Sequence, residues 1–484
     1  MIGIPEKVLG VLMLLLLAVM LFPIIRLAFF AAPWYDDYSF AVHVKRFIQE
    51  YGVLKGAWEG ALYVVHTWWY CWQGTFSSIF MMTLMPEVFG EGLYGIGIIG
   101  IVLFFTVASL VFVKSVCKEM LKAETGMQIS VAVLVTLSLV ELIYTAQQGI
   151  FWYNAAVHYT FMHGCLFLLL TLVLKVFYGR TKAGVALAAM FSILLAVICG
   201  GSNFVTALQG ALLMLLVTVI GFLFASRKGL WFLPADVAYG IALYFNVSAP
   251  GNSVRGSLFE GCDAFTSILY SFKAGAEYFW TFTGIITIIL LVAFVLMIWN
   301  SVRKLEFDFR YPGVVSVLSF CFYCTGFTPS YYGMGSEGVS RTLVVVKFTL
   351  QLLVFFNTAY WLGWWMKHRR KNGKEVPAVK QWLPVYVLVG AAAVLWLALS
   401  SNQAGSCSTY GAYYYVHSGE AYNSYAEHEQ RVETIKNSGP VVELEPCVWK
   451  PHFLYRGDLS TDPAAEQNSA LATWYGKEAI YIKE

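Results

Sequence analysis

Runs of about twenty apolar residues recur along this chain, and a run of that length spans a bilayer as a helix. The 484 residues are 58% hydrophobic and only 13% charged, with a mean hydropathy of +0.65. A soluble protein carries about 25% charged residues. We therefore expect an all-α polytopic membrane protein. Eleven spans are predicted, near residues 8–30, 92–115, 127–146, 159–178, 183–200, 203–225, 231–248, 276–299, 312–330, 341–366 and 381–400.

Lysine and arginine distinguish the two sides of this membrane protein. Basic residues follow every even-numbered span, for example Lys114 after the second span and Arg369 after the tenth. Because cytoplasmic loops carry an excess of Lys and Arg, these loops and the N-terminus, with Lys7, are predicted to be cytoplasmic. Eleven spans then leave the C-terminus extracytoplasmic. The net charge of +3 gives no reason to expect nucleic acid as a partner.

The external side carries most of the unusual sequence. Residues 31–91 form a long first external loop, in which "YSFAVHVKRFIQEY" has the apolar spacing of an amphipathic helix suited to the membrane interface. A second, aromatic-rich helix follows, and its polar stripe, which includes His66, is predicted to face either water or a cavity. We divide the chain into a transmembrane domain, 1–400, and a small extracytoplasmic domain, 401–484.

The external tail, 401–484, is predicted to form a small α/β unit. The stretch "YNSYAEHEQRVETIKNSG" is typical of a helix, and "VVELEP" and "EAIYIK" are typical of strands. Cys407 and Cys447 both lie in this tail. A disulfide between them is expected if the tail sees an oxidising compartment.

Two adjacent carboxylates, Asp36 and Asp37 in "AAPWYDDYSF", directly follow the first span. One interpretation is structural, because an acidic residue caps the helix that follows and matches its dipole. The other is chemical, because a partly desolvated carboxylate with a raised pKa can act as a general base toward a sugar hydroxyl, or can hold a divalent cation. The two interpretations are compatible.

Isolated cations and polar residues on the external side are further candidates. Arg255 and Arg341 suit phosphate, because a planar guanidinium binds two oxygens, and they equally suit anchoring to membrane lipid headgroups. Lys273 is a third candidate cation. The remaining candidates stand near external helix ends or loops, where they could bind substrate or serve as packed, turn and cap residues: His66, Glu141, Asn154, His158 and Asn252.

A first membrane helix that runs directly into an external loop with a "YDDY" motif, interfacial helices and about ten further spans resembles the GT-C superfamily of membrane glycosyltransferases. The resemblance covers roughly residues 1–400. The segments "WWYCWQGTF" and "APGNSVRG" are also similar to segments of a bacterial branch of such proteins. Members of the superfamily take a sugar from a polyprenyl-phosphate carrier and transfer it outside the cytoplasm.

The resemblance implies a site and its partners. Asp36 or Asp37 would deprotonate the acceptor hydroxyl or help to bind Mg²⁺ or Mn²⁺, which not every member needs. External arginines would stabilise the leaving lipid phosphate. The donor would be a polyprenyl-phosphate sugar, and the acceptor a cell-surface polysaccharide, a teichoic acid or a lipid-linked glycan at a bacterial plasma membrane.

Two other functions stay open at this point. A lipid-linked glycan polymerase or ligase would rest on a large external loop with Arg and His, whereas the large loop here carries Asp. A transporter or flippase of a lipid-linked sugar would place charges near the bilayer midplane and show symmetry between its halves.

Overall fold

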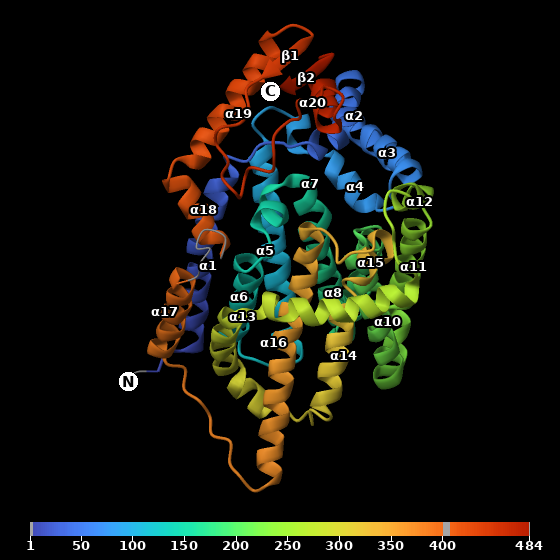
Figure 1. The fold of residues 1–484 in the computed structure, drawn as a ribbon. Helices are drawn as coiled ribbons and strands as arrows, with labels where there is room; N and C mark the ends of the chain where they lie inside the picture. Colours follow the sequence, from blue (N-terminus) through green and yellow to red (C-terminus); the bar gives the residue numbers. More distant parts are fainter. Residues whose placement is uncertain (1–2, 400–406, 484) are drawn as a thin grey trace.

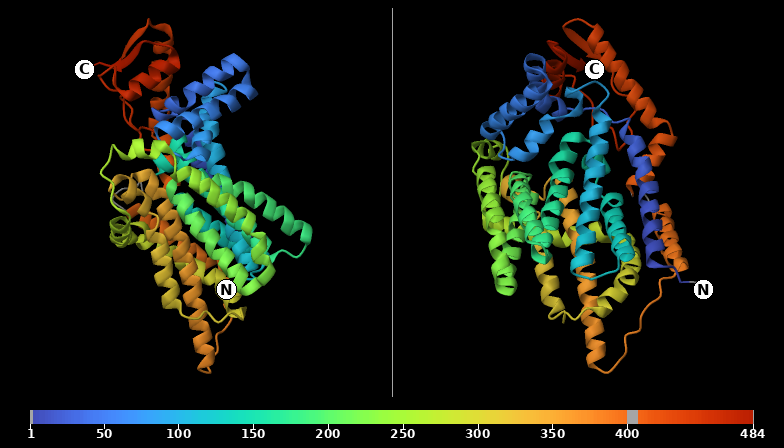
Figure 2. Two further views of the ribbon diagram at one scale, coloured as in Figure 1. Left: turned by 90° about the vertical axis from the view of Figure 1, so that its right-hand side faces the viewer. Right: turned by 180° about the vertical axis from the view of Figure 1, so that it is seen from behind.

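The computed structural model describes residues 3–399 and 407–483, and long helices dominate it. Figure 1 shows these helices side by side in a bundle, with shorter helices of the first external loop and the C-terminal tail gathered at one end. The two views of Figure 2 show the same arrangement from the side and from behind. Residues 400–406, where the predicted last span meets the tail, lie outside the described residues.

Nine helices among the described residues are long and apolar enough to cross a membrane, so this chain is a multi-pass membrane protein. They are α1 (Glu6–Ala28), α5 (Tyr94–Glu119), Tyr153–Tyr178, which ends with α8 (Met162–Tyr178), α9 (Lys182–Gly200), α10 (Phe204–Ala225), Gly229–Val247, which contains α11 (Leu233–Val247), α13 (Ala264–Lys304), Pro312–Met334, which contains α14 (Pro312–Cys324) and α15 (Thr328–Met334), and α16 (Ser340–Lys371). Each overlaps a span predicted from hydropathy.

The other two predicted spans are shorter apolar helices of 17 residues each, α6 (Thr125–Glu141) and α17 (Leu383–Leu399). Nearly every residue of α6 is buried, and this helix packs against α1, α5 and α13. In contrast, α17 buries none of its described residues. The structure therefore does not confirm the predicted count of eleven spans.

A break at Gly284 divides α13 into two helices. Gly284 has φ 58° and ψ 178°, a conformation that side-chain-bearing residues rarely adopt. In Figure 1 the part of α13 before this break runs across the bundle, and the part after it turns down along the other helices. The span predicted near 276–299 lies within α13, and the break inside it was not predicted, because a glycine inside an apolar run carries no hydropathy signal.

The loop that was predicted to be the first external one contains α2 (Asp36–Tyr51), α3 (Val53–Cys71) and α4 (Phe76–Thr83). The amphipathic helix expected from the sequence is α2, which buries Phe40, Ala41 and Val44 along one face. Its chain reverses into α3 at Gly52, whose φ of 81° favours glycine. The two helices then pack against each other, and α2 also contacts α20 of the tail.

The tail has the predicted helix and both predicted strands. It consists of α18 (Ser408–His417), α19 (Glu420–Asn437), β1 (Val441–Leu444), α20 (Glu466–Tyr475) and β2 (Ala479–Ile482). The strands are parallel, with Val441 opposite Ala479 and Leu444 opposite Ile482. The tail also contacts the first loop, where Lys45 of α2 donates from Nζ to the Trp474 carbonyl at 3.1 Å and stacks on its ring.

Both tail cysteines are free thiols with different partners, so the expected disulfide was wrong. Cys407 donates from Sγ to Glu141 Oε2 at 3.0 Å, next to the membrane helices. Cys447 instead contacts the guanidinium of Arg431 on α19.

The two ends of the bundle differ in kind. In Figure 1 the N-terminus and the loops that follow α5, α13 and α16 lie at the end away from the tail. The predicted basic loops therefore share one end, and the helices α2–α4 share the other end with the tail. The assignment of the basic end to the cytoplasm stays a prediction.

Candidate active site

The two carboxylates of the YDDY motif begin α2 at the end that carries the tail. The preceding residue, Tyr35, has φ 26° and ψ −89°, which is strained for a residue with a side chain. Such strain persists only where the surroundings hold it, and it concentrates at functional sites. Beyond this turn the two neighbours differ, since Asp37 is fully buried and Asp36 is partly exposed.

Asp37 is part of the framework. Its Oδ2 accepts hydrogen bonds from the backbone N–H of Trp34 at 2.9 Å and from the Tyr94 hydroxyl at 2.8 Å. Its Oδ1 accepts from the backbone N–H of Asn154 at 3.1 Å. Burial raises the pKa of Asp37 to about 7, and these hydrogen bonds oppose a further rise. Asp37 thus connects the start of α2 to α5 and α7 (Tyr153–Ala156).

The side chain of Asp36 has no hydrogen bond or ion pair to another residue in the part of the chain that the structure describes. Burial raises its pKa, while the charges of Arg341, Arg456 and Arg255 lower it and that of Glu466 raises it. The three arginines come from α16, the tail and α12 (Pro250–Gly256). Asp36 is therefore an available carboxylate, held in a field of cations from three distant segments.

Trp152 brings two of these arginines together. The guanidinium carbon of Arg456 lies 3.4 Å from the centroid of the Trp152 ring, and that of Arg341 lies 5.3 Å from it. Burial, and after it the charge of Arg341, lowers the pKa of Arg456 to about 10. Two like charges on one indole, without a carboxylate bonded to either, are suited to an anionic ligand.

The third arginine, Arg255, belongs to α12 and has different contacts. Its Nη1 donates to Oε1 of the buried Gln73, and its guanidinium stacks on Trp72, with the guanidinium carbon 5.5 Å from the ring centroid. Asn252 fixes this arrangement, because its Oδ1 accepts from the Gly74 N–H at 3.0 Å. The amide nitrogen of Asn252 is bonded to backbone carbonyls as well. Asn252 is thus a positioning residue, whereas the sequence also allowed it to bind sugar.

His158 lies in a short π-helical segment, Val157–Phe161, of a kind often found at functional sites. Its Nδ1 is 2.7 Å from Ser78 Oγ, and the ring is almost fully buried. The positive charges of Arg255 and Arg341 interact electrostatically with the His158 ring. The structure therefore brings His158 to the arginine cluster.

Several buried polar atoms beside the arginines have no partner among the described residues. They are Oδ1 and Nδ2 of Asn154, Nε1 of Trp152, and Nε and Nη1 of Arg456. An unpaired buried polar atom costs free energy comparable to a lost hydrogen bond. The oxygen atom among them can accept a hydrogen bond from a ligand or from ordered water, and the nitrogen atoms can donate one. Asp36, Arg255, Arg341, Arg456, Trp152, Asn154 and His158 are called the Asp36 cluster below.

The remaining predicted residues have other contacts. His66 is exposed on α3 and packs against Tyr70, with 5.1 Å between ring centroids. Lys273 is 72% exposed and faces Glu277 at 3.9 Å. Glu141 accepts from the Thr409 N–H at 2.9 Å and from its hydroxyl at 2.6 Å. The predictions that these three residues bind substrate find no support, because Glu141 anchors α18 and the other two face outward.

The sequence did not indicate Arg456, because nothing in "PHFLYRGD" shows that the tail folds back onto residues 147–154. Two contacts hold this tail loop on the bundle. Gln147 donates from Nε2 to the carbonyls of His452 at 3.0 Å and Tyr455 at 2.5 Å. The rings of Phe151 and Phe453 stack with centroids 5.8 Å apart.

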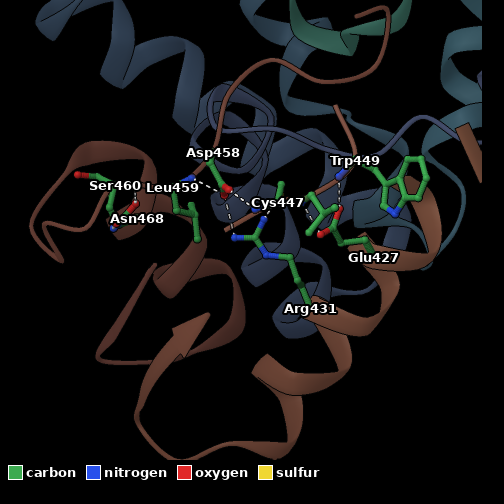
Figure 3. Close-up of polar contacts among 9 residues, drawn as sticks. Glu427, Arg431, Cys447, Trp449, Asp458, Leu459, Ser460 and Asn468 are labelled. Carbon is green, nitrogen blue, oxygen red and sulfur yellow. Dashed lines mark hydrogen bonds and ion pairs between the residues drawn. The ribbon is translucent and has the colours of Figure 1, made fainter. Parts of the chain in front are cut away.

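Figure 3 shows the polar contacts that fix the same loop inside the tail. Arg431 of α19 forms an ion pair with Asp458 at 2.8 Å, and both side chains are mostly buried. Asp458 also accepts from the backbone N–H of Cys447 at 2.5 Å and from that of Leu459 at 2.8 Å. Because Asp458 follows Arg456 by two residues, this network sets the position of the Arg456 backbone.

The pair Asp36–Asp37 does not fit a divalent cation. Such a cation takes several oxygen ligands, but the Asp37 oxygens are bonded to framework donors. The other charged neighbours of Asp36 include three arginines, which would repel a cation. Within the described ranges, no group of three or more His, Cys, Asp or Glu residues could hold a metal ion.

Two cavities lie at different ends of the molecule. The larger, about 540 Å³, lies between α13, residues 378–382 and α17 and shares no residue with the Asp36 cluster. The smaller, about 120 Å³, lies between the α1–α2 connection and the tail, and Arg456 is one of its lining residues. Of these two cavities, the smaller adjoins the cluster.

Comparison of the chain with protein-family models, with curated proteins and with solved structures finds no match.

Proposed function

We propose that this chain is a glycosyltransferase that moves a sugar from a polyprenyl-phosphate carrier onto an extracytoplasmic glycan or lipid-linked acceptor. One observation carries the proposal. The carboxylate of Asp36 is unpaired, although three arginines act on it, and none of the three forms an ion pair with a carboxylate in the described chain. A base beside cations that can bind a phosphate is what transfer from a lipid phosphate to a hydroxyl requires.

In the proposed reaction, Asp36 accepts the proton of the acceptor hydroxyl. The hydroxyl oxygen attacks the anomeric carbon of the donor sugar and forms the new glycosidic bond. The bond from that carbon to the lipid phosphate oxygen breaks, and the phosphate leaves with the electron pair. The anomeric configuration inverts in this single displacement.

The arginines stabilise the charge that develops on the leaving phosphate. Arg341 and Arg456 are held on Trp152, and Arg255 is held by Gln73 and Trp72. Donors held in place before the reaction need no reorganisation when charge develops, and this is usually a large contribution to catalysis. The raised pKa of Asp36 makes it a stronger base than an exposed aspartate.

The test is turnover by the purified protein in nanodiscs, with a panel of polyprenyl-phosphate sugars and candidate acceptors added from one side. We expect release of polyprenyl phosphate and a new glycosidic bond with one donor. Asp36→Asn should lower the turnover about 10²–10⁴-fold while donor binding survives. Asp263→Asn is the matched control, because Asp263 is an exposed helix cap whose side chain accepts from the backbone N–H groups of Phe265 and Thr266. Full turnover in Asp36→Asn would contradict the proposed base.

A lipid-linked glycan ligase or polymerase is the second candidate. It is favoured by three arginines that act on one carboxylate, two of which, Arg255 and Arg341, also act on His158. A donor carried on a diphosphate brings one more negative charge than a donor carried on a monophosphate. Turnover only with diphosphate-linked glycans would therefore select this candidate over the first.

A flippase would move the lipid-linked sugar across the bilayer without making a bond. One observation favours it: Lys347, inside α16, has no ion pair to any described residue and lies over the Phe282 ring at 5.9 Å. Ionisable residues inside a span are typical of transport paths. Translocation of labelled lipid without glycosidic bond formation would replace the transferase proposal.

A further inference from the structure

The small cavity beside the Asp36 cluster is built jointly by two distant parts of the chain. Trp34 and Tyr38 line it from the α1–α2 connection and α2, and Tyr425, His428, Trp449 and Arg456 line it from the tail. Neither part alone encloses this space. The tail therefore contributes both an arginine of the cluster and most of a neighbouring cavity.

The size of the cavity suits a single sugar ring. A water molecule needs roughly 10–15 Å³ of such space, so about 120 Å³ holds on the order of ten water-sized positions. A hexose has about twelve non-hydrogen atoms, so the number of its atoms is similar to the number of water-sized positions in the cavity. A prenyl chain or a folded peptide is far larger.

The lining combines flat rings with a few polar groups, as ligand sites commonly do. Aromatic faces of Trp34, Tyr38, Tyr425 and Trp449 offer apolar walls to the C–H faces of a sugar. Nε and Nη1 of Arg456 are buried and lack partners among the described residues. These nitrogen atoms can donate to hydroxyl oxygens.

His428 adds a group that can both donate and accept. No hydrogen bond joins its ring to another residue of the described chain, and burial lowers its pKa to about 4. The ring is therefore neutral at pH 7, with one N–H donor and one nitrogen acceptor. This pairing matches a hydroxyl, which also donates and accepts.

Two other polar residues of the cavity, Glu427 and Arg431, are already bonded and keep its walls in place. Glu427 accepts from the backbone N–H groups of Val448 and Trp449 at 2.8 and 3.0 Å. Arg431 is paired with Asp458 at 2.8 Å. Figure 3 shows these contacts along one side of the tail loop. The cavity is thus held open by bonds that do not involve a ligand.

We infer that this cavity is the acceptor subsite, and that it takes one sugar ring of a glycan acceptor. The inference rests on the proposed transferase function and gives the tail a role in it. Arg456 is shared by the cavity and the cluster, and its charge acts on Asp36. Trp34, another wall residue, is bonded to Asp37 next to Asp36. An acceptor sugar in the cavity would therefore lie next to the residues that surround the base.

The test measures sugar binding directly, without turnover. The full-length protein in nanodiscs would be titrated with a panel of methyl hexosides and followed by saturation-transfer NMR. We expect one hexoside to bind. Tyr425→Ala should weaken its binding by about tenfold, because a stacking wall is lost. Tyr422→Ala is the matched control, since Tyr422 lies on the same helix but is 64% exposed and outside the cavity.

His428→Gln provides a second variant if Tyr425→Ala does not fold, and it should weaken binding in the same assay. Two results would overturn the inference. One is the absence of binding for every hexoside, and the other is binding that is lost in Arg255→Gln but unchanged in Tyr425→Ala and His428→Gln. In both cases donor turnover by the wild type could persist, so failure of the subsite is distinguishable from failure of the transferase proposal.

Discussion

Arg310, at the end of the helix bundle away from the tail, and the two arginines on Trp152, at the tail end, have opposite environments. At the end away from the tail, Arg310 is 75% exposed and pairs with Asp308 at 2.8 Å. At the tail end, Arg341 and Arg456 stack on Trp152, and no carboxylate pairs with either in the described chain. The orientation of a membrane protein depends on Lys and Arg in its loops, and exposed cations such as Arg310 are sufficient for that role. Buried, unpaired cations carry a cost that a ligand can offset.

The largest expected effect separates these two classes of arginine. Arg456→Gln should lower the turnover by about 10²–10³-fold, because it removes a preorganised donor to the leaving phosphate. Arg310→Gln, at the other end, should change turnover less than about twofold. Steady-state release of polyprenyl phosphate measures both. Equal losses in the two variants would erase the distinction between the ends.

The pH dependence should identify which carboxylate titrates. Burial raises the pKa of Asp36 above its usual value near 4. As pH falls through that raised pKa the base becomes protonated, so turnover should fall about tenfold per pH unit on the acid side. Asp36→Asn should abolish this acid limb. An unchanged limb in Asp36→Asn would assign the titration to another group.

The tail network should matter less than the arginine that it positions. Arg431→Gln breaks the pair with Asp458 and should raise the donor KM by about tenfold with a smaller change in kcat, because Arg456 is displaced and not removed. Arg431→Lys should restore part of the affinity. Lys436→Gln, on the same helix with an exposed partner, is the control. A pure loss of kcat would contradict a positioning role.

The smallest expected effect concerns the contact between the tail and α2. Lys45 lies 4.1 Å from the centroid of the Trp474 ring, and its pKa is lowered by burial. Lys45→Ala should cost about 0.5–1 kcal/mol of stability. Thermal unfolding in detergent would detect it as a small fall in Tm. A large fall would mean that this contact, and not Gln147 with Phe151, docks the tail.

The sequence predicted those features that depend on local chemistry. Apolar runs predicted the membrane helices because a bilayer demands them, and α2 followed from its apolar spacing. The break at Gly284 escaped notice, since it depends on packing and not on composition. Arg255 and Arg341 stood out as isolated cations, whereas Arg456 depends on a contact between the tail and residues 147–151.

The different environments of Asp36 and Asp37 also lay beyond the sequence. The two identical neighbours differ in large part through Tyr94 and Asn154, whose donors come from distant segments and bond to Asp37. Spacing along the chain contains no such information. The sequence therefore predicted where the two carboxylates lie along the chain, but not which of them is bonded to the framework and which is available.

The central claim is that Asp36 reacts while Asp37 holds the fold. The most direct test measures kcat and unfolding side by side for Asp36→Asn and Asp37→Asn. We predict that Asp36→Asn loses turnover with little change in Tm. Asp37→Asn should lose about 2 kcal/mol of stability, because its amide leaves a buried donor unpaired, and should keep measurable turnover. The reverse pattern, with Asp36→Asn active and Asp37→Asn stable but inactive, would contradict this assignment.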